Sequence, residues 1–84
     1  MPNWSITSKM FRSYNEARQF IKDHRNDLGE DDYKTSIGKL DIAWNLLRDA
    51  MNDHTYLKLI WKEAHLQNVE IVDRATGKVV KRYD

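Results

Sequence analysis

Three histidines, His24, His54 and His65, are the side chains with the clearest potential for catalysis or metal binding. A helix presents two imidazoles to one zinc ion when they stand four residues apart, as in the His-Glu-x-x-His pattern. No two of the three histidines have that spacing, and the chain contains no cysteine that could add a thiolate ligand. We therefore expect structural or surface histidines and predict no metal site.

The acidic and nucleophilic residues also lack a catalytic pattern. Serine and threonine occur outside any Gly-x-Ser-x-Gly motif, and the three glycines are too far apart for a phosphate-binding loop. One acidic cluster lacks the alternating oxygen ligands of a calcium loop, so helix capping explains it better. That cluster comprises Asp27, Glu30, Asp31 and Asp32. These observations predict a protein that is not an enzyme and has no cofactor.

Basic residues form two groups that could contact nucleic acid. Arg18, Lys22 and Arg25 recur along one edge of an expected helix. Phosphates require positive charge and unstacked bases require an aromatic face, and both are present near the C-terminus. An ordinary solvated surface explains both groups better than nucleic-acid contact does, because acids are interleaved with the cations and lysines also protect edge strands. The candidate nucleic-acid residues are Arg74, Lys78, Lys81, Arg82 and Tyr83.

Apolar residues are unusually dense between positions 56 and 66. One helical stripe contains Leu57, Ile60, Trp61 and Ala64, and further apolar residues lie outside it. A central helix that is covered on several sides would explain this density. The alternative is a docking surface for another protein, to which aromatic residues contribute strongly. The candidate interface consists of Tyr56, Leu59, Trp61 and Leu66.

The composition indicates one folded domain over residues 1–84. Its 40% hydrophobic and 32% charged residues are typical of a globular protein rather than a disordered tail. Fourteen basic and thirteen acidic residues leave a net charge of +1, which provides no overall attraction to nucleic acid or to an anionic membrane. No segment is apolar enough for a signal peptide or a membrane span. We expect a cytoplasmic protein that does not bind membranes.

Helical periodicity follows a short alternating segment. Alternation of apolar and polar residues predicts a strand over residues 3–8. Ser13 and Glu16 fit a capping box that starts a helix over residues 14–28, with Gly29 as its stop. A second helix is expected to follow, because the acids of residues 30–32 favour a helix N-terminus; Gly38 weakens its first turns, so it could begin as late as Ser36, and it extends to about Met51. The apolar stripe of this second helix consists of Tyr33, Ile37, Leu40, Trp44, Leu47 and Met51.

The apolar stripe changes phase at Asn52 and Asp53. Either residue could cap a third helix that carries the apolar positions described above. No glycine or proline enforces the break, so one bent helix is the alternative. After this helix, two β-branched runs within Val69–Asp84 flank the turn-forming residues 74–77 and predict a hairpin. The expected pairs are Asp73–Lys78, Val72–Val79, Ile71–Val80 and Glu70–Lys81.

The sequence therefore predicts an α+β fold. It consists of a short N-terminal strand, three helices and a C-terminal β-hairpin, with a small antiparallel sheet packed on the helices. A helical core with a protruding hairpin is the alternative. The leading functional hypothesis is a small non-enzymatic protein-binding module, such as an adaptor, inhibitor or regulatory accessory protein, whose partner is another protein or a second copy in a homodimer. Nucleic-acid binding through the hairpin and the first helix is the second hypothesis.

Overall fold

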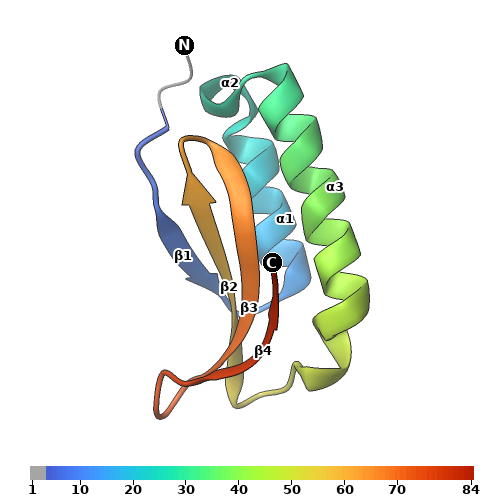
Figure 1. Ribbon diagram of the computed structural model, residues 1–84, viewed down its shortest axis with the longest axis vertical. Coiled ribbons are helices and arrows are strands. Elements are labelled where there is room, and N and C mark those ends of the chain that lie inside the picture. Colours follow the sequence, from blue (N-terminus) through green and yellow to red (C-terminus); the bar gives the residue numbers. More distant parts are fainter. Residues whose placement is uncertain (1–3) are drawn as a thin grey trace.

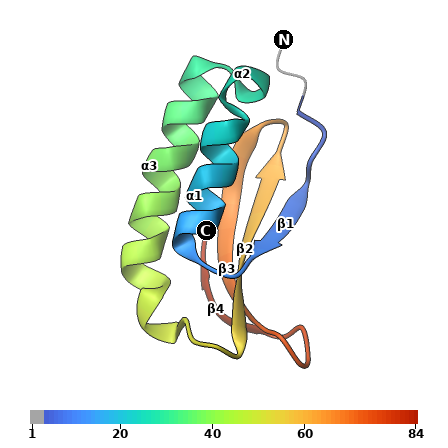
Figure 2. The same cartoon turned by 180° about the vertical axis from the view of Figure 1, so that it is seen from behind.

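Helices cover one face of a four-stranded antiparallel sheet in the computed structural model, which describes residues 4–84 (Figures 1 and 2). The strands lie side by side in chain order, so the C-terminal hairpin belongs to the sheet. This arrangement confirms the predicted α+β fold class and rules out the alternative of a protruding hairpin. The elements are β1 (Ser8–Phe11), α1 (Tyr14–Asp23), α2 (Arg25–Leu28), α3 (Glu30–Leu47), the 3₁₀ helix η1 (Arg48–Ala50), β2 (Thr55–Lys62), β3 (His65–Asp73) and β4 (Val79–Tyr83).

The N-terminal strand begins later than its alternating pattern predicts. Strand β1 pairs with β2 from Ser8 to Phe11, whereas residues 4–7 are not strand and residue 3 lies outside the described part. Trp4 and Ile6 still pack against the core, so their apolar character reflects burial rather than strand pairing. The carbonyl of Thr7 accepts a hydrogen bond of 2.8 Å from the Trp61 amide. This bond attaches the N-terminal segment to the end of β2.

The first predicted helix is divided in two. Ser13 caps α1 as expected, because its Oγ accepts a hydrogen bond of 3.1 Å from the Glu16 amide. His24 leaves the helical conformation, with φ −107° and ψ 20°, and separates α1 from α2. Gly29 ends α2 at a φ of 87°, as a glycine stop requires. The three carboxylates of residues 30–32 form the first turn of α3, where the helix dipole favours them.

The prediction of a third helix beyond Asn52 and Asp53 is wrong, because Thr55–Lys62 form strand β2. Every second residue of this segment is buried, from Thr55 to Trp61. That period of two coexists with the apparent helical stripe, since the opposite face of the strand also carries apolar residues, Tyr56 and Ile60. A two-residue turn, Glu63 and Ala64, then joins β2 to β3. Its positive φ angles are usually supplied by asparagine or glycine, so the sequence contained no hairpin signal here.

The C-terminal hairpin has the predicted turn but a shifted register. The Asp73 carboxylate accepts bonds from the amides of Ala75 and Thr76, and Gly77 takes a φ of 75°. Val72 pairs with Val79 as expected. A bulge then makes Val80 an extra residue, so Ile71 pairs with Lys81 and Glu70 pairs with Arg82. The predicted pairs Ile71–Val80 and Glu70–Lys81 are therefore wrong by one residue.

The core lies between the helices and the inner face of the sheet. Ala17 and Ile21 of α1 and Leu40, Ala43 and Leu47 of α3 are at most 1% exposed. They pack against the alternating buried positions of the two central strands. No helix within residues 4–84 is long and apolar enough to cross a membrane.

Candidate functional site

The predicted protein interface is placed mainly in the core. Leu59, Trp61 and Leu66 are only 0%, 3% and 4% exposed, so they cannot contact a partner while the fold is intact. Their placement on the outside of a third helix was wrong, because β2 directs Leu59 and Trp61 toward the helices. Tyr56 lies on the opposite face of β2 and is half-buried, with the Arg74 guanidinium 4.5 Å from the centre of its ring.

The cations of the hairpin are largely paired with acids. Lys81 Nζ lies 3.2 Å from Asp49 Oδ1, and Arg82 Nε lies 2.6 Å from Asp84 Oδ1. These cations lower the pKa of both aspartates, and the Asp84 carboxylate raises the pKa of Arg82. Arg82 also approaches the buried Glu70 at 3.9 Å.

The remaining candidate nucleic-acid residues differ in their surroundings. Arg74 donates a hydrogen bond of 2.7 Å to the Thr55 carbonyl while it covers the Tyr56 ring. Tyr83 packs against the core. Lys78 is exposed on the turn side of β4. The hairpin therefore spreads the five predicted residues along its length, with Arg74 and Lys78 at the turn and Tyr83 opposite Val69 at the other end, and Arg74, Lys81, Arg82 and Tyr83 already have contacts within the chain.

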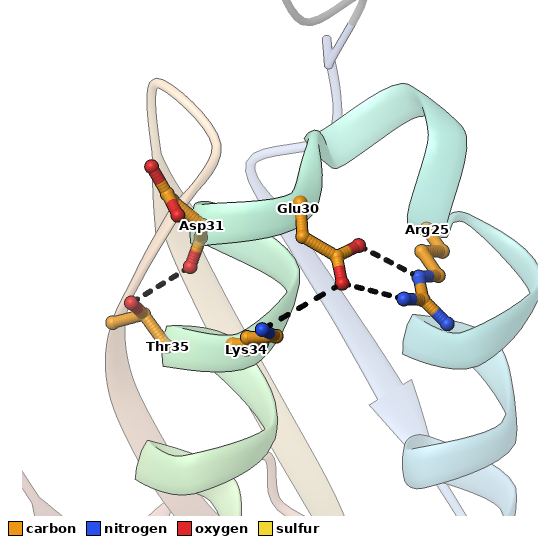
Figure 3. A network of polar contacts seen from close by, with 5 residues as sticks. All are labelled: Arg25, Glu30, Asp31, Lys34 and Thr35. Carbon is orange, nitrogen blue, oxygen red and sulfur yellow. Dashed lines mark hydrogen bonds and ion pairs between the residues drawn. The ribbon is translucent and has the colours of Figure 1, made fainter.

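The basic residues expected along one edge of the first predicted helix include Arg25, which lies in α2 and is paired with an acid. Arg25 donates to Glu30 through Nε at 2.9 Å, and Lys34 approaches the same carboxylate at 3.8 Å (Figure 3). Arg25 lowers the pKa of Glu30 chiefly through this hydrogen bond. In the same network Thr35 donates to the Asp31 carbonyl at 2.8 Å. These contacts join α2 to the start of α3 and have an evident structural role.

The three histidines occupy separate parts of the fold. The imidazole of His24 packs against the rings of both Trp4 and Phe20, with Nδ1 2.8 Å from the Phe20 carbonyl. His65 Nδ1 lies 3.2 Å from Asp32 Oδ1, which connects the β2–β3 turn to α3. His54 is exposed before β2. Residues 4–84 contain no cluster of three or more histidines and carboxylates that could hold a metal ion.

An open cleft of about 440 Å³ lies beside the first turn of α1. Its aromatic wall consists of the stacked rings of Tyr14 and Trp44, whose centres are 5.3 Å apart. Tyr14 donates a hydrogen bond to Asp41, and burial together with this carboxylate raises the Tyr14 pKa. A phenol that stays protonated can donate a hydrogen bond but is a poor nucleophile. The lining residues are Arg12, Ser13, Tyr14, Asn15, Trp44, Met51, Asn52 and Asp53.

The longest helix carries an apolar surface that the sequence analysis did not single out. Ile42 and Leu46 are one turn apart on α3, and each is 54% exposed. Lys39 lies about one turn before them on α3, and Asp49 follows them in the 3₁₀ helix η1. We call the surface made by Lys39, Ile42, Leu46 and Asp49 the α3 flank. Ile42 and Leu46 lie outside the helix's own apolar stripe, and that departure is the signal that could have identified them.

The position of the α3 flank follows from the other sides of the helix. Leu40, Ala43 and Leu47 face the sheet, whereas Trp44 stacks on Tyr14 of α1. The flank consequently points away from α1, on the side where Asp49 pairs with Lys81 of β4. Both views show α3 at the outer edge of the helical layer (Figures 1 and 2).

Comparison with known proteins provides no functional assignment. No family model, no curated protein and no solved structure matches the chain.

Proposed function

We propose that this protein is a small non-enzymatic protein-binding module, acting as an adaptor, inhibitor or regulatory accessory protein through the α3 flank. The observation that carries the proposal is the exposure of Ile42 and Leu46, each 54% exposed on neighbouring turns of the same helix. Burying such side chains against a partner is favourable by about 25 cal/mol per Å² of apolar surface.

Rigidity and charge support the same surface. Lys39, Ile42 and Leu46 of the flank belong to an 18-residue helix whose opposite side is fixed by fully buried residues, and Asp49 lies in η1 directly after it. A partner would therefore bind a preorganised surface, with little loss of conformational freedom on this side of the interface. Lys39 and Asp49 stand at the two ends of the apolar pair, as polar residues do at the rim of an interface.

Nucleic-acid binding has weaker support from the geometry. Non-specific binding to nucleic acid depends on cations that are free to replace counterions along the phosphates. Lys81 and Arg82 instead contact acids of the same chain, and Arg74 covers the aromatic face of Tyr56. We therefore retain protein binding as the single proposed function.

Position-specific crosslinking tests the proposal. A photoreactive amino acid is introduced at Leu46, and a matched control carries it at Lys62, an exposed residue at the end of β2. Both variants are expressed in cells that naturally produce the protein and are irradiated. We expect a discrete heavier adduct from position 46 and none from position 62. Equal labelling at both positions, or no adduct from position 46 or from a further probe at Ile42, contradicts a binding role for the flank.

A further inference from the structure

We infer that the partner of the α3 flank is a second copy of this chain, with the two α3 helices packed antiparallel about a two-fold axis. This inference rests on the proposed function and names its partner. A two-fold interface brings the same surface patch from both copies together, so the patch must be complementary to itself. The α3 flank meets this requirement in both its apolar and its charged residues.

The order of residues along the flank provides the complementarity. Lys39 precedes Ile42 by three residues, and Asp49 follows Leu46 by three residues. When two such helices pack antiparallel and Ile42 of one copy lies opposite Leu46 of the other, Lys39 lies opposite the second copy's Asp49. The two-fold axis generates a second Ile42–Leu46 contact and a second Lys39–Asp49 contact. An apolar centre is then closed by an ion pair of opposite charges at each end.

The two charged residues of the flank differ in exposure, because Lys39 is half-buried and within electrostatic range of the Asp84 carboxylate, whereas Asp49 is exposed. The Asp49 side chain is 76% exposed although it pairs with Lys81, so its carboxylate can accept a second cation. A parallel arrangement would place Lys39 beside Lys39 and Asp49 beside Asp49, which is unfavourable. The charges therefore favour the antiparallel over the parallel orientation of the two α3 helices.

Two copies could instead associate by pairing their β4 edge strands into one extended sheet. The properties of β4 make this alternative less favourable. It is an edge strand of only five residues with a bulge at Val80, and it carries Lys81 and Arg82. Short length, bulges and charged side chains are the features that prevent edge strands from pairing with another chain. The contact between copies is therefore made by the helices, which pack at 8–10 Å in globular proteins.

The size of the flank predicts a reversible dimer. From Lys39 to Leu46 it covers about 10 Å of α3, at 1.5 Å per residue, and Asp49 lies beyond the end of that helix in η1. Stable interfaces of standard size bury about 800 Å² per partner, whereas the flank offers two half-exposed apolar side chains and two charges per copy. We expect a dissociation constant on the order of 10–100 µM.

Sedimentation equilibrium of the purified full chain over about 1 µM to 1 mM measures this association. We expect a monomer–dimer equilibrium in the wild type and at least about a tenfold higher Kd for Leu46→Asp. Asn45→Asp is the control, because it adds the same charge at an exposed neighbouring position outside the flank. Circular dichroism verifies that each variant is folded. A wild type that remains monomeric throughout, or a dimer that is unaffected by Leu46→Asp, overturns the inference.

Charge reversal tests the antiparallel register. Lys39→Glu and Asp49→Lys each place like charges across the interface and should weaken the dimer, whereas the double variant restores opposite charges and should recover most of the affinity. Lys81→Gln controls for the loss of the Asp49–Lys81 pair within one chain and should change Kd by less than about threefold, as expected for an exposed ion pair. Additive weakening in the double variant overturns the register.

The two experiments distinguish failure of this inference from failure of the proposed function. A monomeric chain that crosslinks from position 46 to a different protein overturns the homodimer and leaves the binding role intact. A monomeric chain without a position-specific adduct overturns both. An adduct of twice the chain mass from position 46, together with rescue by charge reversal, supports both.

Discussion

Glu63 and Ala64 occupy the left-handed backbone region, with φ angles of 52° and 72°, in the turn between β2 and β3. A residue with a Cβ atom loses about 1–2 kcal/mol in this conformation, and asparagine tolerates it better than glutamate. The pairing of β2 with β3, which continues to Lys62 and His65, holds the exposed Glu63 in this unfavourable conformation. Local strain is thus maintained by long strands.

Replacing Glu63 by Asn should stabilise the protein by about 1 kcal/mol because it relieves this strain, and should raise Tm by about 4–8 °C. Thermal unfolding followed by circular dichroism measures the change. Ala64→Gly is the matched control: its relief of strain is offset by loss of a methyl group that is only 1% exposed and by the greater flexibility of the unfolded chain. An unchanged or lowered Tm for Glu63→Asn would show that the turn is not strained by its first residue.

At the scale of elements, α3 connects the candidate surface to the core. One side of this helix is fixed against the sheet and another stacks on α1, whereas the flank adjoins the C-terminal residues, where Asp49 pairs with Lys81 and Lys39 lies within electrostatic range of Asp84. Gly38 lies within this helix, and a Cβ atom added there would meet nothing within 4 Å. The helix therefore tolerates a weak position that no packing requirement explains.

The substitution Gly38→Ala should stabilise the protein by about 0.8–1 kcal/mol, the difference in helix propensity between the two residues. Urea denaturation, with an unchanged m-value, provides the measurement. The same change at Gly29 or Gly77 should destabilise, because their φ angles of 87° and 75° are unfavourable for alanine. If Gly38→Ala also destabilised the protein, the helix would not continue unstrained through this position.

At the scale of the whole molecule, stability depends on a single small core. A chain of 84 residues typically has a folding free energy of about 4–13 kcal/mol, at 0.05–0.15 kcal/mol per residue. The two central strands contribute four fully buried side chains to the sheet face that packs against α1 and α3: Leu57, Leu59, Val69 and Ile71. Loss of one such side chain removes a large part of the total stability.

The substitution Leu59→Ala should destabilise the protein by about 2–4 kcal/mol through lost burial and a residual cavity. Ile60→Ala, on the opposite face of β2 and only half-buried, should have a clearly smaller effect. Chemical denaturation of the two variants compares them directly. Equal losses, or a greater loss at Ile60, would contradict the alternation that distinguishes this strand from the helix expected from its sequence.

Several local features followed from the sequence alone. The Ser13 cap, the glycine stop at Gly29, the turn over residues 74–77 and the α+β class were all predicted correctly. Helix caps and tight turns satisfy backbone hydrogen bonds between residues only a few positions apart, so short segments of sequence are sufficient to specify them.

The remaining features depended on contacts between distant residues. Strand β2 obtains its hydrogen-bond partners from β1, where Phe11 pairs with Leu57, and from β3. Because β2 has apolar residues on both faces, the helical and strand periods were both present, and only the pairing with β1 and β3 selected the strand. The same tertiary packing buried Leu59, Trp61 and Leu66 and left Ile42 and Leu46 exposed. Local hydrogen bonding thus determined the caps and turns from sequence, whereas long-range pairing decided which apolar side chains form the core and which form the candidate interface.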